Sequence, residues 1–443
     1  MRKPWILVPA SLLVFLLACT LLYFLPPVHS RLAWRLAHLR TQVYYYFNPP
    51  QEAVFLPQEQ QQIEAIVQAT LLAVTQAAGS LTPPTATPTP EPTSTQPGPT
   101  PTPEPTATQT VAPTPIPDSV VLNGLIHEWQ QMNNCGPATL ATLLTYWGWQ
   151  GDQRDTRLYL RPNFATVDDK NVNPDEMVRY VETQTGLQAL WRVGGDIELI
   201  KRLIAAGFPV IIEKGFEPPK EDWMGHYQAI NGYDDGRGRF ITQDSYIDKN
   251  IPLPYPDLQD RWWRDFNNVF VVAYPAERQG ELHAMLGAHA DPLANYQSAA
   301  EKAQQEIPSL QGRDLFFAWF NLGANLTLAQ DFIGAAQAFD QAFVMYAALP
   351  EDERPWRVLW YRHEPYQAYY NAGRYQDVIN LANTTLAFLA QPILEESLYW
   401  RGMAKAALGD GEGAIKDFQR AYSINPTSTG AADELSKLGA GVP

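Results

Sequence analysis

Cysteine is scarce in this chain: its 443 residues include two, Cys19 and Cys135. Cys19 lies within an apolar run near the N-terminus, so the rest of the chain has one thiol and no disulfide framework. A lone thiol in an enzyme-sized domain is either a small buried core residue or a nucleophile. The sequence around Cys135 is therefore needed to distinguish a structural role from a chemical one.

Basic residues are also fewer than acidic ones. The chain has 32 lysines and arginines against 47 aspartates and glutamates, and its net charge is -15. No basic run occurs beyond the extreme N-terminal region. Because binding to the phosphate backbone depends on cationic side chains, we expect no nucleic-acid partner.

Motifs for metals and nucleotides are missing from the sequence. The seven histidines form no His-Glu-x-x-His pattern and have no metal-ligand spacing with cysteine. There is no Gly-x-x-x-x-Gly-Lys-Ser/Thr loop, which excludes a P-loop nucleotide site. The sequence therefore predicts no metal and no cofactor.

What the chain does contain is an apolar N-terminal run. Residues 5–25 carry no charge and are long enough to cross a bilayer as one helix. We favour an uncleaved, single-pass membrane anchor within residues 1–30. The alternatives are a cleaved signal peptide ending near Ser30 and a lipoprotein signal at Cys19. Arginines both precede and follow the run, so the positive-inside rule does not choose an orientation.

Proline is concentrated after this region. Many of the 38 prolines fall within residues 81–118, a Thr/Pro-rich linker that follows a helical juxtamembrane region at residues 31–80. Repeated proline favours extended polyproline II, at about 3.1 Å per residue. The linker would then be a semi-rigid spacer on the order of 100 Å long, as is common on cell-surface proteins. We therefore expect the remainder of the chain to lie outside the cytoplasm.

Two further regions follow, in keeping with a length that exceeds one hydrophobic core. Residues 119–280 mix helix and strand patterns, and the aromatic run 262–266 is expected to pack against the sheet. Residues 290–430 are helical throughout, with a recurrent spacing of small and aromatic residues: Trp319, Leu322, Gly323, Ala335, Phe339, Ala342, and then Gly402, Gly409, Ala414, Phe418, Ala421 and Pro426. This spacing resembles tetratricopeptide repeats, which implies a scaffold that binds a partner protein.

The surroundings of Cys135 favour a nucleophile. The segment 133–138 reads Asn-Asn-Cys-Gly-Pro-Ala and precedes an apolar helical pattern. Proline is preferred in the first helical turn, so Cys135 is predicted at or just before a helix N-terminus. The helix dipole and unpaired N–H groups there stabilise a thiolate and the oxyanion of acyl transfer. A core cysteine at a helix start is the alternative.

A base and an acid can be proposed from a predicted hairpin. His226 opens a strand-like run, and the turn residues 234–238 separate it from the next strand. Centring the turn near residue 235 places Asp244 opposite His226, where a carboxylate would orient the imidazole. If the register slips, Asp234 or Asp248 is the alternative acid. A histidine with a purely structural hydrogen bond is the competing interpretation of His226.

Together these segments resemble a known family. Residues 127–138, His-Glu-Trp-Gln-Gln-Met-Asn-Asn-Cys-Gly-Pro-Ala, are similar to the nucleophile segment of the C39-like peptidases, and residues 225–234 are similar to their histidine strand. The resemblance implies an α+β papain-like fold with Asp244 in its usual place after the hairpin. It also implies that Gln130, or alternatively Gln131, donates to the oxyanion. Some family members are fused to ABC transporters and cut leader peptides after a double glycine. This chain has one apolar run and no P-loop, so it is not such an exporter, and we do not expect that specificity.

The sequence thus leads to one hypothesis and two alternatives. The hypothesis is a multidomain, membrane-anchored cysteine peptidase that hydrolyses a peptide or isopeptide bond by acyl transfer, with repeats that bind a partner or the substrate; hydrolysis of another kind of amide, or transpeptidation, would fit the same residues. Its predicted catalytic residues are Cys135, His226, Asp244 and Gln130. The first alternative is a catalytically inactive papain-like binding module on a tetratricopeptide adaptor. The second is a structural surface protein.

Overall fold

The computed structural model describes residues 17, 20–24, 39, 43, 47, 54–58, 116–162, 171–219, 221–387, 394–427 and 429–443. Residues 117–443 belong to one compact unit, which also includes the described residues up to Pro57. The expected membrane span, juxtamembrane helix and Thr/Pro-rich linker lie largely outside the described residues. Within these residues, every helix is either too short or too polar to span a bilayer.

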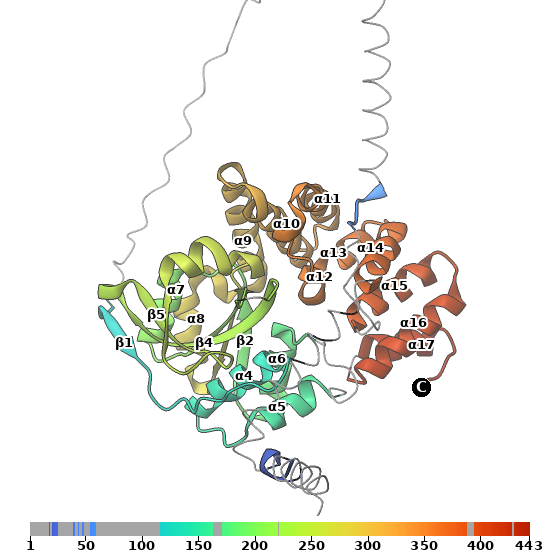
Figure 1. Ribbon diagram of the computed structural model, residues 1–443. Coiled ribbons are helices and arrows are strands. Elements are labelled where there is room, and N and C mark those ends of the chain that lie inside the picture. The colour runs from blue at the N-terminus through green and yellow to red at the C-terminus, as the bar shows by residue number, and fades with distance from the viewer. Residues whose placement is uncertain are drawn as a thin grey trace, which may run out of the picture. The chain divides into compact units, whose positions relative to one another are not determined.

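An antiparallel sheet forms the centre of the first region. Its order is β2-β7-β3-β4-β5-β6, with β1 paired to β4 (Figure 1). The strands are β1 (Ser119–Val121), β2 (Gln188–Arg192), β3 (Val210–Phe216), β4 (Met224–Asp234), β5 (Arg239–Gln243), β6 (Ile251–Pro254) and β7 (Phe270–Tyr274). The apolar start of β3 is buried on both faces of the sheet. The predicted hairpin is β4 and β5, so that prediction is confirmed.

Three helices cover one face of this sheet. Apolar side chains of α4 (Cys135–Tyr146), α5 (Gln153–Leu160) and α6 (Pro174–Gln184) share a core with residues of β2, β3, β4 and β7 (Figure 1). The Thr139 hydroxyl donates to the Tyr227 carbonyl at 3.2 Å and ties α4 directly to β4. This contact brings the start of α4 to the start of β4. The remaining helices of the region are α7 (Ile197–Ala205) and α8 (Gln279–Leu286).

From Pro292 the described chain is helical, as predicted. The helices are α9 (Pro292–Glu306), α10 (Gly312–Leu328), α11 (Phe332–Ala348), α12 (Val358–Tyr361), α13 (Glu364–Asn371), α14 (Tyr375–Ala387), α15 (Glu395–Ala407), α16 (Gly411–Ile424) and α17 (Thr429–Lys437). A Cβ on Gly323 would meet the Phe339 ring at 2.9 Å, and one on Gly402 would meet Phe418 at 2.8 Å. Glycine at these two positions lets paired helices approach closely. The assignment to tetratricopeptide repeats stays a prediction.

The sheet region and the helical region share buried contacts. One hydrophobic cluster includes Trp223 and Phe266 beside Phe316 and Phe317. The amides of Asn267 and Asn325 bond reciprocally, at 2.6 and 3.1 Å, and both side chains are buried. Trp263 and Phe266 are 0% and 2% exposed, which confirms that this aromatic run packs. The helical region is therefore continuous with the core that supports the sheet.

Candidate active site

Cys135 is the first residue of α4, as the sequence predicted. Asn133 has a φ of 49°, so the chain turns sharply before the helix begins. A Cβ at Gly136 would lie 3.0 Å from Met177, which explains why a glycine follows the cysteine. Cys135 itself is partly exposed. The residue thus sits at a helix N-terminus, and part of its surface is accessible to solvent.

The loop before Cys135 is held by two residues that the sequence analysis missed. Gln153 accepts hydrogen bonds from the Asn134 side chain at 2.9 Å and the Gln131 backbone at 3.0 Å, and donates to the Trp129 carbonyl at 2.8 Å. The buried Arg161 guanidinium donates to the Asn133 carbonyl. Neither residue has a local sequence signal, because each acts through contacts made only after α5 packs beside α4.

His226 and Asp244 form a buried pair. The imidazole Nε2 lies 2.9 Å from Asp244 Oδ1, and the two residues are 2% and 0% exposed. Backbone N–H groups of Tyr246 and Ile247 also donate to Asp244 Oδ1, at 2.8 and 3.0 Å, and Gln228 donates to Oδ2. With Nε2 engaged, Nδ1 is the ring nitrogen left for the Cys135 thiol, which forms a side-chain hydrogen bond with His226.

The predicted strand register was wrong by two residues. Observed pairs are Asp234 with Arg239 near the turn and, after a bulge, Ala229 with Gln243. Continuing this register places Asp244 beside Gln228 rather than His226. Because side chains alternate with period two, a shift of two keeps the same face of the strand. Asp244 therefore still reaches His226, from a diagonal position.

Electrostatics favour an ion pair of thiolate and imidazolium. Burial opposes ionisation of Cys135, but hydrogen bonding to His226 and the imidazolium charge lower its pKa below the ordinary value. Burial also opposes the charged imidazole, yet Asp244 outweighs it and raises the pKa of His226 to about 9. The pKa of Asp244 is lowered by His226 and Gln228 despite burial. Each of these three pKa shifts favours the charged form of its group.

The two glutamines before the cysteine have different partners. Gln130 Oε1 accepts a hydrogen bond from the Ser245 hydroxyl at 2.9 Å, and the Gln130 backbone N–H donates to the Ser245 carbonyl at 2.8 Å. Ser245 follows Asp244, so Gln130 is tied to the segment that carries the buried acid. Gln131 Oε1 instead accepts from Arg157 of α5. Of the two, Gln130 is the one linked to the His226–Asp244 pair.

Comparisons with known proteins agree with the motifs. Residues 124–270 match the model of the Peptidase_C39 like family, and this span contains Cys135, His226 and Asp244. Residues 124–270 are thus similar to a C39-like peptidase, which confirms the family resemblance of that span. Among solved structures, the chain is similar to a candidate C39-like peptidase from Bacillus anthracis, with 16% identity, a TM-score of 0.29, and coverage of 35% of this chain and 96% of that one. No curated protein matches the chain.

Residues on β3 pack against His226 from the sheet. The Phe216 ring stacks on the His226 imidazole, with centroids 4.7 Å apart. Lys214 lies opposite His226 in the register, and burial lowers its pKa to about 8 although Asp244 and Asp265 favour its charge. The sequence analysis did not single out these two residues or Gln228. A period-two pattern on β4 would have placed Gln228 on the His226 face.

The helical region also reaches this site. A Cβ on Gly225 would lie 3.0 Å from the Tyr361 ring, so Tyr361 of α12 packs against the backbone directly before His226. The Tyr361 ring also meets Trp223 edge-on, with centroids 5.9 Å apart. The strand that carries the histidine is therefore supported by a residue from the C-terminal helices.

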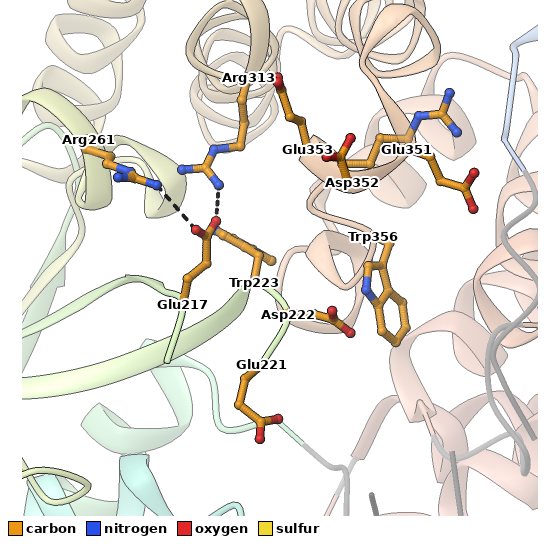
Figure 2. A pocket seen from close by; sticks show the side chains of 11 residues that line it. Glu217, Glu221, Asp222, Trp223, Arg261, Arg313, Glu351, Asp352, Glu353 and Trp356 are labelled. Atoms are coloured by element: carbon orange, nitrogen blue, oxygen red, sulfur yellow. Dashed lines mark hydrogen bonds and ion pairs between the residues drawn. The ribbon is translucent and has the colours of Figure 1, made fainter. Parts of the chain in front are cut away.

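A separate pocket lies near the connection between β3 and β4. Figure 2 shows this pocket of about 590 Å³, which Glu217, Trp223, Arg313 and Trp356 help to line. Glu217 accepts from Arg261 at 3.3 Å and from Arg313. Cys135, His226 and Asp244 are not among the lining residues. We interpret the pocket as a polar junction between the two regions rather than the place of the chemistry.

The acidic, histidine and cysteine side chains of the described part of the chain do not gather as metal ligands do. Within it, no three or more histidine, cysteine, aspartate or glutamate side chains are grouped so that they could hold a metal ion.

Asp244→Asn is expected to lower the pKa of His226 from about 9 toward its ordinary value of about 6.5, because the carboxylate charge that stabilises the imidazolium is removed. With less imidazolium at pH 7, the pKa of Cys135 should rise and its alkylation rate should fall roughly tenfold or more. NMR titration of the imidazole and alkylation rates against pH measure both effects. Asp234→Asn and Asp248→Asn are matched controls and should change neither. A His226 pKa unchanged by Asp244→Asn would contradict this account.

Proposed function

We propose that this chain is a cysteine peptidase of the C39-like type, which hydrolyses a peptide or isopeptide bond by acyl transfer. One observation carries the proposal: Cys135, at the N-terminus of α4, contacts His226, which is held in turn by the fully buried Asp244. A nucleophile, a base and an orienting acid in that order make up the arrangement that activates a thiol.

In the first half of the reaction, the Cys135 thiolate attacks the substrate carbonyl carbon. The carbonyl π electrons move to oxygen, and the backbone N–H of Cys135 and the Gln130 side-chain amide stabilise that oxyanion. The Ser245 hydroxyl orients the Gln130 amide by occupying its Oε1, which leaves Nε2 to donate. As the tetrahedral intermediate collapses, the bond to nitrogen breaks, and the His226 imidazolium protonates the leaving amine.

In the second half, water hydrolyses the thioester. Neutral His226 takes a proton from the water, whose oxygen attacks the acyl carbon. The intermediate expels the Cys135 thiolate, releases the acid and restores the ion pair with the imidazolium. Asp244 stays ionised throughout and holds the ring in the orientation that serves both halves.

The setting of the enzyme is part of the same proposal. An N-terminal anchor in residues 1–30 would hold the chain on a membrane, with the peptidase region outside the cytoplasm. The substrate would be a peptide or protein, and the C-terminal helices would bind a partner protein or the substrate. The apolar run at residues 5–25 and the packing of Tyr361 beside Gly225 support this reading.

The alkylation rate of Cys135 against pH tests the proposed nucleophile. In the full chain carrying Cys19→Ser, Cys135 is the single thiol. We expect a titration midpoint below the value of about 8.5 for a free thiol, because His226 stabilises the thiolate. His226→Ala should move the midpoint to 8.5 or above, and Gln131→Ala, as a control, should not. A normal midpoint that is insensitive to His226→Ala would refute the Cys–His pair.

A further inference from the structure

A short N-terminal segment is docked on the helical region. Residues 54–57 lie beside α13 and α14, and are drawn in blue in Figure 1. Phe55 is 6% exposed and belongs to the same hydrophobic cluster as the helices, whereas its neighbour Val54 is 38% exposed. Pro57 is buried as well. One aromatic side chain from far upstream thus completes a core built by C-terminal helices.

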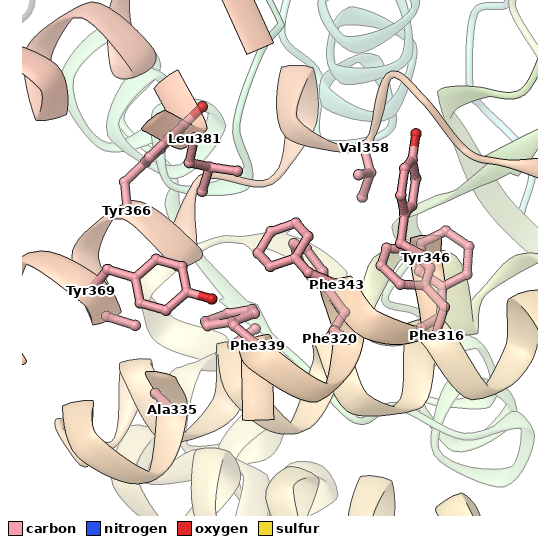
Figure 3. Close-up of a cluster of buried hydrophobic side chains, with 14 of the residues drawn as sticks. Phe316, Phe320, Ala335, Phe339, Phe343, Tyr346, Val358, Tyr366, Tyr369 and Leu381 are labelled. Carbon is pink, nitrogen blue, oxygen red and sulfur yellow. The ribbon is translucent and has the colours of Figure 1, made fainter. Parts of the chain in front are cut away.

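The contacts of Phe55 are specific. Its ring meets the Phe343 ring of α11 edge-on, with centroids 5.0 Å apart and planes at 82°. The ring centroid also lies 6.2 Å from that of Tyr369 on α13. Figure 3 shows Phe343 and Tyr369 within the buried cluster that receives it. Edge-to-face aromatic packing of this kind adds to the gain from burying apolar surface.

The segment binds without secondary structure of its own. Residues 54–57 are neither helix nor strand, and Pro57 restricts the backbone directly after the docked pair Phe55-Leu56. An extended segment with one aromatic anchor and a nearby proline is the form in which many short peptides occupy grooves between helices or aromatic side chains. The face of α11 and α13 therefore has the geometry of a peptide-binding surface.

We propose that this face is a docking site for an extended segment with an aromatic anchor, and that its occupant is residues 54–57 of the same chain. The chain leaves the compact unit after Pro57 and re-enters it at Pro117, just before β1, which pairs with β4. Both ends of the intervening segment are then attached to the same unit. The residues before Phe55 then lie between an N-terminal anchor and the compact unit.

This arrangement predicts that a cut in the chain between Pro57 and Pro117 does not release the N-terminal piece. In the full chain, a recognition site for a sequence-specific protease is inserted between Gly98 and Pro99. After cleavage, the two pieces should co-elute in size-exclusion chromatography at micromolar concentration. Phe55→Ala should weaken their association by roughly 100-fold or more, because a buried aromatic side chain is lost. Val54→Ala, the matched exposed control, should leave it unchanged.

Two results would overturn the proposal: separation of the pieces from the unsubstituted chain after cleavage, or equal retention in Phe55→Ala and Val54→Ala. Phe55→Leu keeps an apolar side chain and should retain the N-terminal piece to an intermediate degree. Cys135 alkylation in each variant, measured before cleavage, reports whether the body is folded. The test does not depend on peptidase activity, so its failure would leave the proposed function untouched.

Discussion

Cys135→Ser is expected to lower kcat/KM for peptide hydrolysis by at least about 10⁴-fold, whereas Cys19→Ser should leave it unchanged. Serine keeps the size of the side chain, but its hydroxyl has a much higher pKa than a thiol and does not form the ion pair with His226. Loss of a nucleophile that acts as a unit with its base removes most of the catalysis supplied by all three groups. By transition-state arithmetic, this loss is roughly 5 kcal/mol.

The measurement is the cleavage of a peptide mixture, followed by mass spectrometry, at equal concentrations of folded protein. Hydrolysis by Cys135→Ser within tenfold of the unsubstituted chain would exclude Cys135 as the nucleophile. If the unsubstituted chain cuts no peptide although Cys135 titrates as a thiolate, an inactive binding module becomes the better account. The helical region would then be the first place to look for a partner.

Arg362→Ala is expected to destabilise the fold by about 3–5 kcal/mol, the range for breaking a buried ion pair. Arg362 is 5% exposed and donates to Asn321 Oδ1 at 2.7 Å and to the Asp265 carbonyl at 3.4 Å. It also pairs with Glu364 at 3.3 Å. Its loss would leave Glu364 without its ion-pair partner and the Asp265 carbonyl without this donor, across the junction of the two regions.

The pH dependence of this effect has a definite sign. Burial raises the pKa of Glu364, but Arg362 outweighs it and holds that pKa below its ordinary value. A carboxyl group with a lowered pKa stabilises the fold above its unfolded pKa, and this stabilisation is lost as the pH falls. The difference between Arg362→Ala and the unsubstituted chain should therefore shrink as Glu364 becomes protonated.

Urea unfolding followed by tryptophan fluorescence and by far-ultraviolet circular dichroism measures this prediction. The two probes should give one coincident transition, since the sheet and the helices share a core. Arg237→Ala is the control, because that side chain is 68% exposed and should contribute nothing measurable. Two separate transitions, with the sheet region unaffected by Arg362→Ala, would disprove the coupling.

Much of the site could be predicted because its signals are local. The Asn-Asn-Cys-Gly-Pro run specifies a helix start at Cys135, and a turn-rich stretch between two strand-like runs specifies the β4–β5 hairpin. The pairing register of β4 and β5 was harder to predict from the sequence. It depends on a four-residue turn and on a bulge after Ile230, and neither is set by the pattern of apolar residues. The pairing of His226 with Asp244 survived because the error was an even number of residues.

By itself, the sequence determined the chemistry of the site: one thiol at a helix start, one histidine opening a strand, and a carboxylate beyond the hairpin turn. Only the tertiary structure decided what surrounds them. Gln153 and Arg161 hold the loop before Cys135, Tyr361 packs behind Gly225, and Phe55 enters a core built far downstream. Local backbone preferences act over a few residues and can be read in order along the chain. Contacts between distant segments depend on which apolar surfaces meet in the folded chain, and no single stretch of sequence encodes that choice.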